Sequence, residues 1–200
     1  EEHLLGPLAH AQDLQTGPVQ RERGGGERLA KRLVDAGHAT VLATRSEGYE
    51  RRSEVLFQVD PGRPEDYERL LDEALPAGHE AFAGVVYAWA LDVPPPGADP
   101  ERFSEDARTL AAENAALLVR ALARSKQRTP LVLLTAGAQP GPSDAGLSAP
   151  GQAPLWGLGR VVALEHPELC CRRIDLGGEP AELEWDALAR ELLSKGDTDE

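Results

Sequence analysis

Three consecutive glycines, Gly24, Gly25 and Gly26, are the first place where this sequence could do chemistry. A dinucleotide-binding loop has the pattern G-x-G-x-x-G directly after a hydrophobic strand, and its third glycine lets the helix pack closely on that strand. Here the third position is Leu29, and the run before the glycines, "PVQRER", is mostly polar. We therefore favour a glycine turn that begins a helix, with a cofactor-binding loop as the alternative.

A tyrosine with a lysine four residues later is the second arrangement to test. In carbonyl reduction the tyrosine can donate the proton, and a nearby lysine lowers its pKa. The tyrosines Tyr49, Tyr67 and Tyr87 are followed four residues later by serine, leucine and leucine. Tyr87 also lies inside a strongly apolar stretch, so we expect it to be structural. The sequence predicts no tyrosine-based site.

The other reactive side chains are isolated. Asp92 follows an apolar stretch and could serve as an acid at the carboxyl edge of a sheet, although capping a loop is the commoner role for such an aspartate. Glu165 and His166 are adjacent, and a histidine at a helix end usually faces the last carbonyls. Cys170 and Cys171 are neighbours, and such free thiols fit a reducing cytoplasm. We predict no metal site and no catalytic residue.

Composition restricts the class of protein. The 200 residues carry 34 acidic against 21 basic side chains, a net charge of −13, and nucleic acid binding requires a basic face instead. No apolar run approaches the roughly 20 residues that span a bilayer, and no signal peptide is recognisable. The sequence therefore predicts a cytoplasmic domain that binds neither nucleic acid nor membrane.

Alternating strands and helices follow the glycine turn. The strands are predicted at residues 39–44, 55–59, 82–91, 130–137 and 171–176. The helices are predicted at residues 27–36, 64–74, 104–123, 153–165 and 183–193, with a proline-rich loop at 92–101. Near-continuous apolar strands are typical of parallel sheets covered on both faces. This order predicts an α/β fold, a truncated Rossmann-like, doubly wound parallel sheet with helices on both faces.

The stretch "APLWGLGRVVALEHPELCCRRIDL", residues 153–176, resembles the structural subdomain of the ketoreductase of modular type I polyketide synthases. "VVYAWALDVP", "ENAALLVRALA" and "PLVLLTAGAQP" are similar to the middle section of the same family, which is related to short-chain dehydrogenases/reductases. The resemblance implies a Rossmann-like structural subdomain at residues 24–196. Residues 1–23, in which the first strand is poor, are expected to be irregular, and 197–200 to be a polar tail leading to a missing partner subdomain.

The resemblance also implies a function. In this family a non-catalytic half supports a second half, which binds NADPH and reduces β-ketoacyl groups on acyl carrier protein. That active half carries G-Q-x-x-Y-x-x-x-N. Gly151 and Gln152 match this pattern, but Leu155 stands at the tyrosine and Gly159 at the asparagine, while Thr135 keeps a hydroxyl where the active half has serine. The resemblance thus implies a scaffold with no cofactor of its own, whose partners are the catalytic subdomain, acyl carrier protein or enoylreductase.

The helix at 153–165 would then serve for contacts. Each of its two interior glycines costs on the order of 1 kcal/mol of helix propensity, a loss that a close approach by a partner would explain. The predicted interface residues are Trp156, Gly157, Leu158, Gly159 and Arg160. Trp156 as an ordinary core residue is the alternative for this site. For the whole chain the alternatives are a degenerate NADPH-binding reductase and a small binding module near Asp92.

Overall fold

The structure is a computed structural model that describes residues 24–74, 82–97, 99–125, 128–140 and 148–194. The predictions for residues 1–23 and 197–200 fall outside these residues. The strands are β1 (Leu42–Arg45), β2 (Glu50–Arg51), β3 (Leu56–Val59), β4 (Val85–Tyr87), β5 (Leu131–Ala136) and β6 (Arg172–Leu176). The helices are α1 (Gly25–Asp35), α2 (Pro64–Ala74), α3 (Pro100–Arg108), α4 (Asn114–Arg124), α5 (Pro154–Glu165) and α6 (Glu182–Leu193).

The strands form two sheets of three strands each. One has the order β1-β3-β2 and the other the order β4-β5-β6. All neighbouring strands are parallel except β2 and β3, which are antiparallel. The α/β, Rossmann-like architecture is confirmed, but the single sheet expected from the sequence is divided between β1 and β4.

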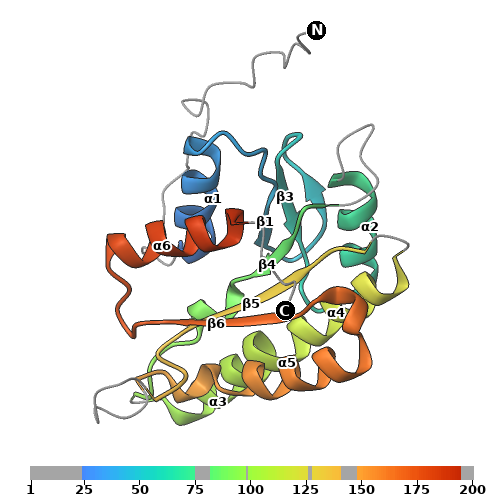
Figure 1. Cartoon of the computed structure of the whole chain (residues 1–200). Helices are drawn as coiled ribbons and strands as arrows, with labels where there is room; N and C mark the ends of the chain where they lie inside the picture. Colours follow the sequence, from blue (N-terminus) through green and yellow to red (C-terminus); the bar gives the residue numbers. More distant parts are fainter. Residues whose placement is uncertain (1–23, 75–81, 98, 126–127, 141–147, 195–200) are drawn as a thin grey trace, which may run out of the picture.

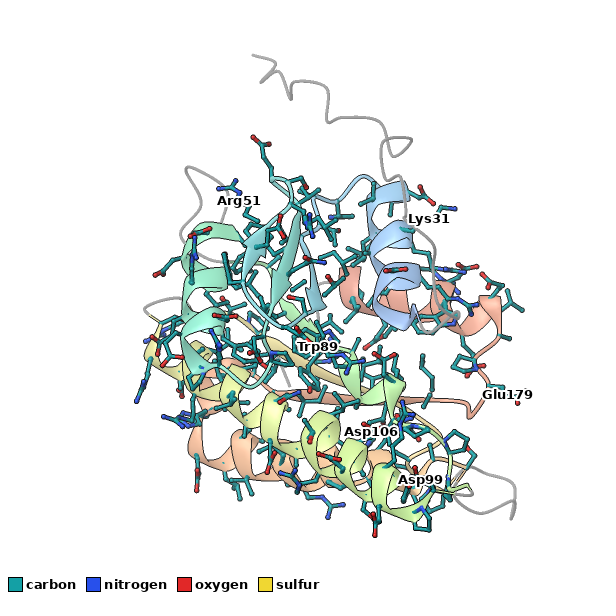
Figure 2. All side chains as sticks on the ribbon, turned by 180° about the vertical axis from the view of Figure 1, so that it is seen from behind. Lys31, Arg51, Trp89, Asp99, Asp106 and Glu179 are labelled. Atoms are coloured by element: carbon teal, nitrogen blue, oxygen red, sulfur yellow. The ribbon has the colours of Figure 1, made fainter. Side chains whose placement is uncertain are left out.

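Helices cover both faces of the strands (Figure 1). Helices α1 and α6 lie on one side of the β4-β5-β6 sheet, and α3, α4 and α5 lie on the other. Charged side chains such as Lys31, Arg51 and Glu179 are exposed at the periphery, whereas Trp89 lies near the centre (Figure 2). A doubly wound arrangement of this kind is the one that near-continuous apolar strands require.

Strand β5 shows how the two cores are built. All six of its residues are buried. Because successive side chains of a strand point to opposite faces, Leu133 joins the core under α2, α4 and α5, and Leu134 joins the core under α1 and α6. Trp185 of α6 and Leu155 of α5 are buried in these two cores, one on each side. The β5 strand is therefore the centre of the domain.

The strand predicted at 82–91 was too long. Only Val85–Tyr87 pair as β4, and Trp89–Asp92 form a 3-10 helix, η2. The Trp89 ring packs edge-on against Tyr87, with centroids 5.6 Å apart, and Ala90 is fully buried. The apolar run continues beyond the strand because this turn is also core, and periodicity cannot separate a strand from a short buried turn.

The remaining differences concern element ends. The strand predicted at 39–44 is displaced to 42–45, and the short hairpin strand β2 was not predicted. The helix predicted at 104–123 begins earlier, at Pro100, because the Asp99 side chain accepts a hydrogen bond from the backbone N–H of Arg102 at 3.0 Å. A π-helical segment, η3 (Thr109–Glu113), joins α3 to α4. A 3-10 turn, η4 (Pro150–Gln152), precedes α5, which starts at Pro154.

Candidate functional site

A Rossmann-like sheet holds its ligand outside the carboxyl ends of its parallel strands, and we describe first the ends of β5 and β6. Thr135 of β5 is directly opposite Asp175 of β6 in the parallel register, and Thr135 is fully buried. Trp156, in the first turn of α5, approaches the same point. These three side chains form the polar cluster of this edge.

Each polar side chain in this cluster has a hydrogen-bond partner within the cluster. The indole Nε1–H of Trp156 donates to the Thr135 hydroxyl oxygen at 2.9 Å, and this hydroxyl donates to Asp175 Oδ1 at 2.6 Å. A hydroxyl has one proton and two lone pairs. Because the proton is directed at Asp175, Thr135 has none left to polarise a substrate carbonyl.

The loop that follows β5 is held by the same aspartate. Asp175 accepts the backbone N–H of Ala138 through Oδ1 at 3.0 Å and that of Gln139 through Oδ2 at 2.9 Å. On the other side, the buried Gln152 side chain accepts the backbone N–H of Ala136 at 2.9 Å. The polar side chains at this edge therefore fix the backbone of the chain itself. Asp175 and Gln152 were not predicted to have this role.

Chain segments also fill the space beyond the strand ends. Gly137 has φ +73°, and a Cβ there would lie 1.9 Å from Ser148 Oγ. A Cβ on Gly178 would lie 2.2 Å from the same oxygen, and Ala149 N–H donates to Gly137 O at 2.9 Å. Ser148 thus packs directly between the loops that follow β5 and β6. Between the ends of β5 and β6 the edge is therefore occupied by Ser148.

Leu155 and Gly159 stand where the resemblance implies a tyrosine and an asparagine in the catalytic half, and both are inside the protein. Leu155 is fully buried. Gly159 is buried against the sheet, because a Cβ there would lie 2.7 Å from Arg173 Cδ and 3.0 Å from Leu133 Cδ1. Arg173 also lies over the Trp156 ring, 5.6 Å from its centroid. The close approach that favours glycine at 159 is therefore made by side chains of β5 and β6 of the same chain.

The other predicted interface residues lie further out. Gly157 and Arg160 are exposed, and a Cβ on Gly157 would meet nothing within 4 Å. Trp156 and Leu158 are half-buried, Leu158 against the core beneath α5. Their contact with a partner stays a prediction.

Most of the other candidates from the sequence have structural contacts. Asp92 forms an ion pair with Arg45 at 2.6 Å, which links the end of η2 to the end of β1. His166 Nδ1 lies 3.1 Å from Glu168 Oε1. The Tyr87 hydroxyl donates to the backbone carbonyl of Leu110 at 2.6 Å, and burial raises the pKa of Tyr87 well above its usual range. This confirms the structural role expected for Tyr87.

The glycines at the start of α1 are explained by packing. Gly24 is the N-cap, and a Cβ on Gly25 would lie 2.4 Å from Leu91 Cδ1 and 3.2 Å from Trp185. The helix therefore lies directly on η2 and α6 at this point. The contacts favour a glycine turn that begins a helix.

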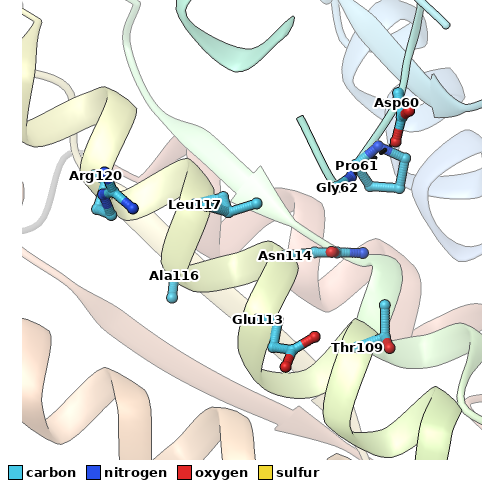
Figure 3. Close-up of a pocket in the computed structure, with 9 residues that line it drawn as sticks. All are labelled: Asp60, Pro61, Gly62, Thr109, Glu113, Asn114, Ala116, Leu117 and Arg120. Carbon is cyan, nitrogen blue, oxygen red and sulfur yellow. Dashed lines mark hydrogen bonds between the residues drawn. The ribbon is translucent and has the colours of Figure 1, made fainter. Parts of the chain in front are cut away.

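A shallow pocket of about 620 Å³ lies between α4 and the loop after β3 (Figure 3). Asn114 extends from the helix toward Pro61 and Gly62, with Glu113 and Arg120 on the same helix. Asn114 is 2% exposed, and its Nδ2 has no hydrogen-bond partner within the part of the chain that the structure describes. The pocket could offer a donor to one acceptor group, and its two carboxylates, Asp60 and Glu113, form ion pairs with Arg63 and Arg108.

The described ranges contain neither a membrane-spanning helix nor a cluster of metal ligands. No helix in these ranges is long and apolar enough to cross a membrane. No group of three or more histidine, cysteine, aspartate or glutamate side chains in them could hold a metal ion.

A family of sequences matches nearly the whole of the described chain. The model of the "Polyketide synthase extender module SpnB, Rossmann fold domain" matches residues 26–198. The pikromycin polyketide synthase component PikAII of Streptomyces venezuelae is 35% identical over 136 residues, 66% of this chain. The polyketide synthase GfsA of Streptomyces halstedii is 42% identical over 84 residues, 42% of this chain. The chain spans only 3% and 1% of the length of these two relatives.

Solved structures agree with this match. A C2-type ketoreductase from a modular polyketide synthase is 27% identical, with a TM-score of 0.59 over 86% of this chain and 33% of its own. An A1-type ketoreductase is also 27% identical, with a TM-score of 0.54 over 71% of this chain and 28% of its own. A multidomain structure of a keto acid-selecting NRPS module, which includes a ketoreductase, has a TM-score of 0.68 over 84% of this chain and 14% of its own. At 17% identity this last likeness shows the fold alone.

Proposed function

Because this chain belongs to the family of Rossmann-fold domains of polyketide synthase extender modules, we propose that it is the non-catalytic half of a ketoreductase, which supports the half that carries out the reduction. One observation carries the proposal. The hydroxyl at the expected catalytic position, that of Thr135, donates its proton to Asp175 and accepts from Trp156. Reduction of a carbonyl requires a proton donor beside the substrate. Leu155, at the place of that donor, is a buried alkyl side chain.

Two sets of contacts support a chain with no NADPH of its own. Gly25 lies against Leu91 and Trp185, and Ser148 fills the space between Gly137 and Gly178. In this proposal, NADPH and the β-ketoacyl substrate on acyl carrier protein bind to the partner half. The same contacts oppose the alternative of a degenerate NADPH-binding reductase.

The outer face of α5 provides a surface for the partner. Gly157, Val161 and Leu164 follow one another at helical spacing of four and three residues, which places them on one stripe. Val161 is 46% exposed and Leu164 is 82% exposed. Helix α4 packs beside α5 on the same face of the sheet. An exposed apolar stripe on a surface helix is typical of a protein–protein contact.

Co-expression with the catalytic half from the same polyketide synthase tests this function. We expect the two halves to co-purify and to oxidise NADPH with a β-ketoacyl thioester. The double substitution Val161→Asp and Leu164→Asp should weaken association at least 100-fold, because it places two charges in an apolar contact.

Leu183 on α6 provides the matched control. It is 77% exposed, and its helix α6 lies on the other side of the β4-β5-β6 sheet from α5. Leu183→Asp should leave both association and NADPH oxidation unchanged. Equal association of the wild-type chain and the α5 double variant would contradict the scaffold role of this face.

A further inference from the structure

Arg173, in β6, is a half-buried cation that lies against α5. A Cβ at Gly159 would lie 2.8 Å from its Cγ, and its guanidinium carbon is 5.6 Å from the centroid of the Trp156 ring. Its Nε is buried and has no hydrogen-bond partner in the part of the chain that the structure describes. Burial removes hydration from a charge, so buried charges are normally paired with an opposite charge. The Trp156 ring supplies only part of this compensation.

The neighbouring arginine on the same strand differs in this respect. Arg172 is exposed and forms an ion pair with Glu191 of α6. Because successive side chains of a strand point to opposite faces, Arg172 lies on the α6 side of the sheet and Arg173 on the α5 side. Among the described residues, no carboxylate forms an ion pair with Arg173. Of two adjacent arginines, the more buried one is therefore the one without an acidic partner.

The outer nitrogens of Arg173 are the polar atoms that a partner can reach. Nη1 and Nη2 donate no hydrogen bond within the described ranges, and unlike Nε they are not buried. β6 and α5 pack side by side (Figure 1), and in the described residues β6 pairs only with β5. The guanidinium group is therefore accessible where α5 meets the edge of the sheet. Its two outer N–H groups match the two oxygens of a carboxylate.

The helices on this face are poor in acidic residues, although the chain as a whole has a net charge of −13. Helix α4 contains no aspartate or glutamate, and α5 contains only Glu165, its last residue. By contrast, α2 carries five acidic side chains and α6 carries four. Arg120 of α4 and Arg160 of α5 are exposed, and no described residue forms an ion pair with either. The charge on this face is therefore complementary to an acidic partner.

We propose that the catalytic half contributes a carboxylate side chain that binds the outer nitrogens of Arg173 beside the Trp156 ring. This inference rests on the proposed function, in which the catalytic half covers the outer face of α5. Arg160 is four residues from both Trp156 and Leu164, so it joins this site to the exposed apolar stripe. One partner can therefore cover both. Tryptophan and arginine are also the residues most enriched where protein interfaces bind most strongly.

Sedimentation of the co-expressed complex over a range of concentrations tests the proposal. Arg173→Met keeps an unbranched side chain against Gly159 but removes the charge, and it should weaken association by about tenfold or more. Arg172→Met is the matched control and should change association by less than about twofold, because it removes an exposed ion pair on the α6 side. Arg173→Lys should give an intermediate affinity, since an ammonium group cannot bind a carboxylate through two parallel N–H groups.

The melting temperature of the isolated chain distinguishes this role from a purely structural one. Arg173→Met should leave it unchanged or raise it, because the isolated chain has no carboxylate to offset the desolvation of the charge. Weak association together with a clearly lowered melting temperature would show that Arg173 is needed for folding, and would overturn the proposal.

A charge exchange identifies the acidic residue. Arg173→Glu should abolish association, and one change of an aspartate or glutamate of the catalytic half to arginine should restore it. If no such change restores it, the proposal is overturned. Association of Arg173→Met as tight as that of the wild-type chain would overturn this inference and leave the proposed function standing. Wild-type halves that do not associate would overturn both.

Discussion

The inner and outer sides of α5 differ in a way that explains the domain. On the inner side Leu155 is fully buried, Gly159 touches the sheet and Trp156 donates to Thr135. On the outer side Gly157 faces open space and Leu164 is 82% exposed. Polar groups that could do chemistry are used for internal hydrogen bonds, while apolar groups are left on the surface. This distribution is the one expected of a helix kept for packing, with a partner on its outer side.

The largest contrast between the two sides should come from the two leucines. Leu155→Ala should lower the free energy of unfolding by about 3 kcal/mol, because it leaves a cavity in a close-packed core. Leu164→Ala should change it by less than about 0.5 kcal/mol, since the side chain is exposed. Urea unfolding of the isolated chain measures both. Similar losses for the two variants would mean that α5 is seated differently.

The same substitution to alanine should have opposite effects on stability at Gly159 and at Gly157. Gly159→Ala should destabilise the chain by about 2 kcal/mol, because the new Cβ would approach Arg173 and Leu133. Gly157→Ala should stabilise it by about 0.5 to 1 kcal/mol through helix propensity alone. Urea midpoints at equal m-values decide the sign of each. A Gly159→Ala variant as stable as the wild-type chain would show that Arg173 and Leu133 do not crowd this position.

The hydrogen bond between Trp156 and Thr135 can be isolated by a double-mutant cycle. Trp156→Phe and Thr135→Val should each destabilise the chain, and the coupling between them should be about 1 kcal/mol, the net contribution of one such bond. Additive effects would show that the two side chains do not interact in solution.

A smaller, pH-dependent effect should arise at the loop after β6. Glu184 accepts the backbone N–H groups of Gly177 at 2.8 Å and of Ala181 at 2.9 Å, and these bonds lower the pKa of Glu184. A lowered folded-state pKa gives stability that is present above the ordinary glutamate pKa and is lost as the pH falls through the lowered value. Melting temperatures of Glu184→Gln and wild type should therefore converge below about pH 4 and separate at pH 7. A constant difference across this range would contradict the assignment.

Apolar periodicity and helix-end residues predicted the helices, because these signals lie within the helix itself. Helix α2 has the predicted bounds, and α6 differs by one residue at its start. The division into two sheets depends on pairings between distant strands, so no local period could predict it. The contact between Trp156 and Thr135 joins residues 21 positions apart and is equally invisible. From the sequence alone, a close approach by a partner would explain both Gly157 and Gly159. In the structure, side chains of β5 and β6 crowd Gly159, whereas Gly157 faces open space.

The most direct test of the central claim is a titration of the purified chain with NADPH, followed by nucleotide fluorescence, together with a turnover assay on a β-ketoacyl thioester. Because Thr135 has no free proton and Leu155 stands at the donor position, we expect no turnover. Because Gly25 packs against Leu91 and Trp185, we also expect no saturable binding up to millimolar NADPH. Saturable binding in the micromolar range, or substrate-dependent oxidation of NADPH by this chain alone, would contradict the account.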